Sequence, residues 1–200
     1  TPHHRYFLQR FVNELPENEN VTLTLMETKP SPWKKNAKRW FFSHFPNIWK
    51  GLVLNPYLFP GFFSGGQAKF ENQSFFPDGN SALPNSLNVE YLGSVNSPEA
   101  ISMLKDVAPD IAVVYGTGKI KSAVFTIPRF GTINAHGGKL PGYRGLDTNL
   151  WAVHQGHPEE IYVSIHEIDE NLDTGAVYLE RQVTVGPSMD LYSLRYFTAL

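Results

Sequence analysis

Strand-like and helix-like segments alternate along the chain from about residue 88, and this alternation limits the possible folds more than any other feature. Residues 111–115 form an uninterrupted apolar run, which is typical of a strand buried on both faces of a parallel sheet. The segment before it opens with Ser97-Pro98-Glu99. Ser is a favourable helix N-cap and Pro suits the first turn, so this segment predicts a helix. Strands that alternate with helices favour an α/β domain with a largely parallel sheet.

The remaining segments extend this pattern over most of the chain. We expect helices over residues 3–15, 97–107, 119–125, 148–155 and 188–200, and strands over residues 21–26, 89–92, 111–115, 132–135, 161–168 and 176–185. The last two strands can pair as a hairpin around residues 169–175. Residues 27–86 are rich in Pro, Gly, Asn, Ser and aromatic residues without a sustained period, and we expect them to form an insertion.

The composition excludes several classes of protein. The 200 residues suit one domain, and 17 Lys and Arg against 19 Asp and Glu give a net charge of −2. This balance excludes a globally basic nucleic-acid binder and a chain kept disordered by its charge. The absence of Cys excludes a disulfide scaffold, a zinc site with Cys ligands and a Cys nucleophile. It is compatible with a reducing cytosol, and we expect a cytoplasmic protein. No apolar stretch is long enough to span a membrane.

Two polar segments carry candidate chemistry. Asn134 and His136 end a predicted strand and, being two residues apart, face the same side of it. An amide donor beside a titratable ring suits a reaction in which a carbonyl oxygen gains negative charge while a proton moves. In the second segment Asp173 can orient a His or accept its proton. Taken separately, each segment is equally well explained as an ordinary polar turn.

Considered together, these segments resemble the folate-dependent formyltransferase family, which includes glycinamide-ribonucleotide, methionyl-tRNA and sugar-nucleotide formyltransferases. The motifs that carry the resemblance are Asn134-Ala135-His136, Lys139-Leu140-Pro141, Tyr143-Arg144-Gly145, Asp173-x-Gly175 and, on an earlier strand, Val113-Val114-Tyr115-Gly116. The resemblance covers residues 98–185. It implies a Rossmann-like, largely parallel sheet flanked by helices, with a C-terminal β-hairpin around the loop of the catalytic Asp.

The resemblance also implies an activity and a site. The reaction is formyl transfer from the co-substrate 10-formyltetrahydrofolate to an amine of a small-molecule acceptor, and no metal is required. The implied catalytic residues are Asn134, His136 and Asp173. The implied folate-binding residues are Tyr115, Gly116, Thr117, Gly118, Lys119, Glu170 and Leu172. The implied acceptor-binding residues are Lys139, Ser164 and His166.

The sequence departs from the family pattern in two places. Gly137-Gly138-Lys139 stands where the family commonly has Pro-Ser-Leu, which leaves the acceptor class open. Thr1-Pro2 resembles the turn after the family's first strand. We therefore expect one catalytic domain over residues 1–200 that lacks its first strand and is truncated at both ends.

Other readings remain open at this point. Residues 29–50 hold six Lys and Arg and no Asp or Glu, with Trp residues among them. This segment can pack on the domain with its cations in solvent, form a lid over the acceptor, or bind nucleic acid or a membrane surface on a non-catalytic scaffold. A hydrolase of the same fold, with water as the acceptor, would keep the same three catalytic residues.

Overall fold

The computed structural model describes residues 1–17, 19–27, 64–186, 189–190, 193–194, 196 and 198. The basic and aromatic segment 29–50, and most of the predicted insertion 27–86, lie outside these residues. Most of the predicted C-terminal helix 188–200 also lies outside them.

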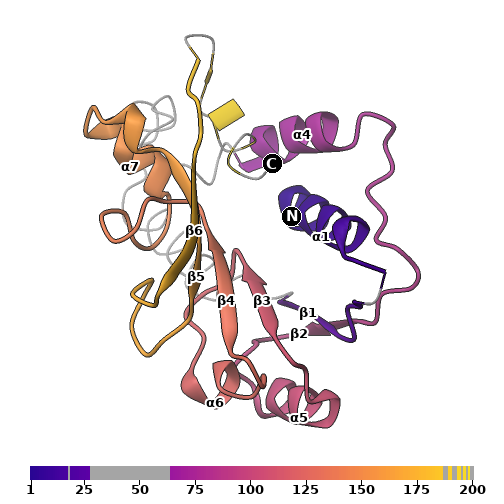
Figure 1. Ribbon diagram of the computed structural model, residues 1–200. Coiled ribbons are helices and arrows are strands. Elements are labelled where there is room, and N and C mark those ends of the chain that lie inside the picture. The colour runs from indigo at the N-terminus through magenta and orange to yellow at the C-terminus, as the bar shows by residue number, and fades with distance from the viewer. Residues whose placement is uncertain are drawn as a thin grey trace, which may run out of the picture.

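The described strands form two sheets (Figure 1). The larger sheet has the order β3 (Ala112–Tyr115), β4 (Thr132–His136), β5 (Tyr162–Glu167) and β6 (Val177–Gln182). Strands β3 and β4 are parallel, whereas β4, β5 and β6 are successively antiparallel. A second parallel pair consists of β1 (Thr24–Glu27) and β2 (Val89–Leu92). The predicted α/β class and the C-terminal hairpin are confirmed, with parallel pairing confined to β1–β2 and β3–β4.

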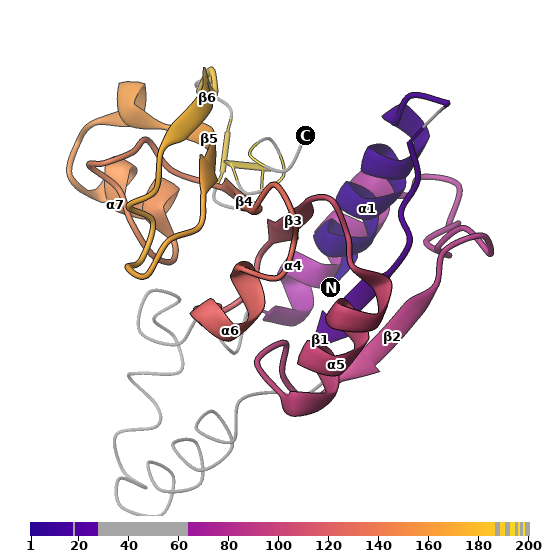
Figure 2. The ribbon, with the colours of Figure 1, turned by 60° about the horizontal axis from the view of Figure 1, so that its bottom comes forward.

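Helices lie on both sides of the larger sheet. The described helices are α1 (Pro2–Glu14), α4 (Ser64–Phe75), α5 (Pro98–Val107), α6 (Ser122–Phe125), α7 (Thr148–His154) and the 3-10 helix η1 (Pro158–Glu160). Helix α7 lies beside β5 and β6, whereas α1, α4, β1 and β2 lie beyond the β3 edge (Figures 1 and 2).

The start of α5 agrees with the sequence prediction. The Ser97 hydroxyl accepts a hydrogen bond of 3.2 Å from the Ala100 amide, and Pro98 occupies the first turn. The helix ends at Ala108, whose φ of 46° is left-handed. Beneath it, Val95, Ile120 and Val124 form a buried apolar cluster, so α5 and α6 are held against the sheet.

Helix α6 is shorter than predicted. Residues 119–121 are predicted to be helical, but they lie outside the helix, and Asn96 hydrogen-bonds their backbone. Its side-chain amide donates to the Lys119 carbonyl at 2.9 Å, and its side-chain oxygen accepts from the Lys121 amide at 2.8 Å. These two bonds satisfy the backbone of the segment before the helix begins.

Helix α4 lies within the predicted insertion 27–86, where the sequence shows no sustained helical period. Two Gly follow its first residue, which weakens local helix propensity. The helix packs instead against α1, where the Tyr6 and Phe75 rings stack with centroids 4.4 Å apart. Buried Glu71 also accepts a 3.0 Å bond from His3. Helix α4 is therefore stabilised by its contacts with α1.

No helix among the described residues is long and apolar enough to cross a membrane.

Candidate active site

The three residues predicted to be catalytic lie together at the junction of β4 and the β5–β6 hairpin. Asn134 and His136 extend from β4, and the loop that joins β5 to β6 brings Asp173 to them. The His136 Nδ1 atom lies 3.7 Å from Asp173 Oδ2, and their side chains are only 7% and 9% exposed. The separation is that of an ion pair rather than a hydrogen bond. A buried carboxylate therefore faces the imidazole on one side.

Two backbone groups from one turn hold His136 and Asp173. The Tyr143 carbonyl lies 2.8 Å from His136 Nε2, and the Gly145 amide donates to Asp173 Oδ2 at 2.7 Å. A carbonyl only accepts, so Nε2 carries a proton in this arrangement. The motif Tyr143-Arg144-Gly145 thus positions both titratable groups through its main chain.

Glycine residues make this close packing possible. A Cβ on Gly138 would lie 2.7 Å from His136 Nε2 and 2.8 Å from the Tyr143 carbonyl, which is closer than such atoms approach. A Cβ on Gly175 would collide with the Glu167 carbonyl. Asp173 itself has a φ of 52°, a left-handed conformation in which Asp and Asn are enriched. The sequence Asp-x-Gly therefore closes a tight loop that points its carboxylate inward.

His166, predicted to bind the acceptor, contacts two of the candidate catalytic residues, Asn134 and Asp173. Only 1% of His166 is exposed. Its Nδ1 lies 2.7 Å from the Glu167 carbonyl, and its Nε2 lies 3.1 Å from Asn134 Nδ2 and 3.4 Å from Asp173 Oδ1. The one sequence signal for this contact is that Ser164 and His166, two residues apart on β5, share a face of the strand.

The charges of this cluster stabilise one another. Burial acts to lower the pKa of His166, but the hydrogen bond and the charge of Asp173 outweigh it, and the net pKa is raised. Burial likewise acts to raise the pKa of Asp173, but the contacts with His166, the Gly145 amide and His136 leave it lowered. Asp173 is therefore ionised at neutral pH, and His166 holds its proton to higher pH than an ordinary His.

Ser164 and Lys139, the other two predicted acceptor-binding residues, contact the protein itself. Ser164 is fully buried, and its hydroxyl lies 2.6 Å from the Gly138 carbonyl and 3.1 Å from Glu180 Oε1. Lys139 Nζ pairs with Glu160 at 2.8 Å. No contact among the described residues joins Lys139 to the catalytic group.

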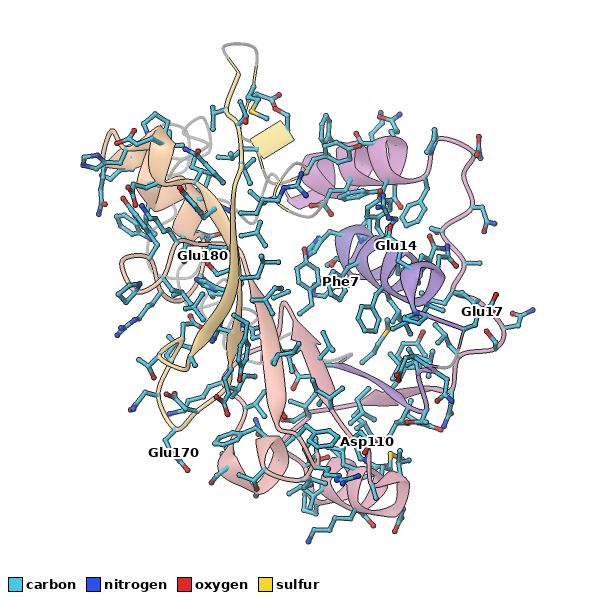
Figure 3. The ribbon with its side chains drawn as sticks, viewed as in Figure 1. Phe7, Glu14, Glu17, Asp110, Glu170 and Glu180 are labelled. Carbon is cyan, nitrogen blue, oxygen red and sulfur yellow. The ribbon has the colours of Figure 1, made fainter. Side chains whose placement is uncertain are left out.

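Glu180 helps to hold the candidate site in place, and the sequence analysis did not identify it. Its Oε1 also accepts from the Leu140 amide at 3.1 Å, so it holds the turn after His136 from the β6 side (labelled in Figure 3). Glu180 pairs in register with Ser164 on the neighbouring strand. Two polar residues at paired strand positions are the signal that could have identified it.

The predicted folate-binding residues fall into two groups. The first group begins at Tyr115, the last residue of β3, and continues through the turn to Lys119. Tyr115 pairs in register with Ala135, which lies between Asn134 and His136 on β4. Glu170 and Leu172 lie in the hairpin loop, where Leu172 is 51% exposed and packs near Gly145 (Glu170 is labelled in Figure 3). No contact that the structure provides among its described residues links the two groups directly.

Helix α1 supports the first group, which the sequence did not predict. Phe7 stacks on Tyr115 with ring centroids 4.3 Å apart (Figure 3). His4 Nε2 lies 3.2 Å from the Gly116 carbonyl, and its ring occupies the space that a Cβ on Gly116 would need. Burial, together with the charge of His3, lowers the pKa of His4 to about 4. His4 is therefore neutral at pH 7 and donates its Nε2 proton to this carbonyl.

Among the described residues, no three His, Asp or Glu side chains are grouped so that they could hold a metal ion.

Solved structures share this fold. A glycinamide ribonucleotide transformylase from Geobacillus kaustophilus matches with a TM-score of 0.58 and 18% identity over 100% of this chain and 85% of that one. A phosphoribosylglycinamide formyltransferase from Bacillus Halodurans matches with a TM-score of 0.57 and 16% identity, over 97% of this chain and 80% of that one. At these identities the likeness establishes the fold.

Curated relatives share sequence over part of the chain. A methionyl-tRNA formyltransferase from Geobacter metallireducens is 35% identical over 101 residues, which are 50% of this chain and 32% of that protein. One from Caldanaerobacter subterraneus is 35% identical over 123 residues, or 60% of this chain and 40% of that protein. The chain thus spans about a third to two fifths of the length of these relatives.

The sequence model of the family described as Formyl transferase matches residues 85–196, more than half of the chain. This match includes β4, the hairpin and all three candidate catalytic residues. The chain belongs to the formyl transferase family.

Proposed function

We propose that this protein transfers a formyl group from 10-formyltetrahydrofolate to an amine of a small-molecule acceptor, with Asn134, His136 and Asp173 as catalytic residues. The observation that carries the proposal is the convergence of an amide, an imidazole and an ionised, buried carboxylate. These three groups match the needs of a reaction that builds charge on a carbonyl oxygen and moves a proton.

The chemistry assigns each residue a role. The acceptor nitrogen attacks the formyl carbon, and the carbonyl oxygen gains negative charge as the new C–N bond forms. The Asn134 amide donates a hydrogen bond to this oxygen, which lowers the barrier because the charge is greatest in the transition state. The bond between the formyl carbon and the folate nitrogen then breaks. The proton lost by the acceptor is the one gained by the folate nitrogen, so the reaction needs no further reactant.

His136 accepts this proton and Asp173 stabilises the charge that results. The carboxylate stabilises the imidazolium that forms when His136 takes up the proton, and the Tyr143 carbonyl keeps the ring in place.

The class of acceptor is supported by a structural neighbour. The formyltransferase PseJ from Anoxybacillus kamchatkensis was solved with a UDP-linked formamido sugar and tetrahydrofolate. It matches with a TM-score of 0.50 and 20% identity over 89% of this chain and 68% of that one. A sugar nucleotide is therefore a rational first acceptor to test, followed by other phosphorylated amines.

The test is an acceptor screen that follows release of tetrahydrofolate from 10-formyltetrahydrofolate. We expect amine-dependent release, and loss of release in His136→Ala while folate binding is kept. His154→Ala is the matched control, because His154 is an exposed imidazole on α7. Transfer at the wild-type rate by His136→Ala would refute the site. Formate release without any amine would identify water as the acceptor instead.

A further inference from the structure

His166 is buried beside the candidate catalytic residues, but the mechanism proposed above gives it no role. Its Nδ1 lies 2.7 Å from the Glu167 carbonyl, which can only accept a hydrogen bond. Nδ1 is therefore the protonated nitrogen in the neutral ring as well as in the charged ring. Any change of charge on His166 consequently takes place at Nε2.

Nε2 has two neighbours with opposite requirements. Asn134 lies at 3.1 Å through its side-chain amide, and Asp173 Oδ1 lies at 3.4 Å. When Nε2 carries a lone pair, Asn134 must turn its NH2 group toward it. When Nε2 carries a proton, that proton is directed at oxygen atoms, and an Asn134 NH2 group facing it is repelled.

The Asn134 side-chain amide can satisfy either protonation state of His166 by flipping, so that its NH2 and oxygen ends exchange places. Its NH2 and oxygen ends are almost the same size, so a separation of 3.1 Å accommodates both orientations. The end that faces away from His166 is the end available to a substrate. With His166 charged, that end is the NH2 donor; with His166 neutral, it is the carbonyl oxygen, which repels a developing oxyanion.

We propose that His166 is a positioning residue whose protonation at Nε2 orients the Asn134 amide so that its NH2 group is presented to the formyl oxygen. This inference rests on the proposed function for its catalytic consequence, but the orientation itself is a property of the protein alone. Loss of an oxyanion donor typically lowers kcat by about 10²–10³-fold, so a charged His166 is needed for full activity.

The groups around His166 favour its charged state. Asp173 faces it from the hairpin loop, Asp169 acts from the same loop, and the His136 ring on β4 lies 5.9 Å away, centroid to centroid. Arg144 acts on Asp169 from the neighbouring turn. The carboxylates raise the pKa of His166 against the effect of burial. Activity is thus expected to fall as the pH rises through this raised pKa.

The decisive test is a nuclear magnetic resonance titration of the whole protein with ¹⁵N-labelled His and Asn, from about pH 5 to about pH 9, which brackets an ordinary His pKa of ~6.5. We expect the Asn134 side-chain NH2 resonances to shift with the same midpoint as the His166 ring nitrogens. Asn134 resonances that stay constant while His166 titrates would overturn the inference. Asp173→Asn should move both midpoints to lower pH together, and movement of one alone would also overturn it.

The catalytic arm uses His166→Gln, whose amide keeps an N–H group at every pH. In the wild type we expect kcat to fall at least ~10-fold as the pH rises through the His166 midpoint. In His166→Gln we expect kcat to show no such decrease, while the KM for folate stays unchanged. The exposed-residue control His154→Gln should retain the decrease. A fall with the same midpoint in His166→Gln would refute the positioning role. If no pH supports transfer, the proposed function fails, and the resonance titration alone decides the inference about Asn134.

Discussion

The hairpin side of the molecule and the α1–α4 side are ordered by contacts of very different range. On the hairpin side, His136 contacts a carbonyl seven residues away, and Gly145 contacts Asp173 28 residues away. On the α1–α4 side, His3 contacts Glu71 across 68 residues, and His4 contacts Gly116 across 112. The first kind of contact appears as a motif in the sequence, whereas the second joins segments that show no common pattern. From this comparison we infer that a sequence motif can be recognised on the hairpin side but not on the α1–α4 side; whether the proposed chemistry is confined to the hairpin side is what the following predictions test.

The largest effect that would test this division is expected for Asp173→Ala. Removal of the carboxylate leaves His136 and His166 without their shared anion, so we expect kcat to fall by about 10²–10⁴-fold. The measurement is formyl transfer at saturating substrate, with folate binding measured separately. The matched control is Asp110→Ala, an exposed carboxylate just before β3 (labelled in Figure 3), which should keep full activity. An equal loss in both variants would point to unfolding rather than chemistry.

The second effect concerns the close packing behind His136. Gly138→Ala would place a methyl group 2.7 Å from His136 Nε2 and 2.9 Å from Thr148 Cβ. We expect the unfolding free energy to fall by ~1–3 kcal/mol and kcat to fall at least ~10-fold, because overpacking shifts the ring. Gly186→Ala, which has no atom within 4 Å, is the control for stability. Unchanged kcat in Gly138→Ala would show that the position of His136 is less constrained than the geometry indicates.

The third effect tests the α1–α4 side. Glu71 is only 2% exposed and pairs with His3, so Glu71→Ala is expected to destabilise the fold by ~1–3 kcal/mol, measured by denaturant unfolding. Transfer by the folded fraction should stay near the wild-type rate. Glu14→Ala, whose carboxylate is exposed beside Arg10, should change stability by less than ~0.5 kcal/mol. A drop in kcat without a drop in stability would mean that the two sides are catalytically coupled.

The smallest effects on the free energy of unfolding at neutral pH are expected from the titration of two His residues, whose pKa values shift in opposite directions. The raised pKa of His166 contributes stability below the ordinary value of 6.5, and this contribution is lost as pH rises through the folded pKa. His4, with its pKa lowered to about 4, binds fewer protons when folded, so stability is lost as pH falls from 6.5 toward 4.

Unfolding measured against pH separates these two contributions. His166→Gln should flatten the alkaline side of the stability profile, and His4→Gln should flatten the acidic side. The lowered pKa of Asp173 adds stability above its ordinary value of 3.8, which is lost as pH falls through the folded pKa. If both His variants altered the same side of the profile, the assignment of one of them would be wrong.

Features whose constraints are local could be predicted. Ser97 and Pro98 marked the start of α5, and the two-residue spacing of Asn134 and His136 placed both side chains on one face. The resemblance to formyltransferases added Asp173, which the loop brings to within 3.7 Å of His136. The roles of these residues and the folate-binding positions stay predictions, as does the single-domain organisation over residues 1–200.

Other features could not be predicted because they depend on a partner far along the chain. Helix α4 has little helical signal of its own, and the stacking of Phe75 on Tyr6 orders it. Residues 119–121 lie outside helix α6 because the Asn96 side chain hydrogen-bonds their backbone. The helix is therefore shorter than predicted. Neither interaction leaves a periodic pattern in the sequence.

The sequence by itself determined the α/β class and the hairpin, since strand alternation and short turn motifs are set by neighbouring residues. Its resemblance to formyltransferases supplied the candidate catalytic residues. Only the tertiary structure decided that His166 contacts Asn134 and Asp173, that Glu180 holds the turn after His136, and that His4 caps the Gly116 carbonyl. The physical reason is that a buried polar atom must find a hydrogen-bond partner wherever the fold places one. Which atom that will be depends on the packing of whole elements, and no local spacing records it.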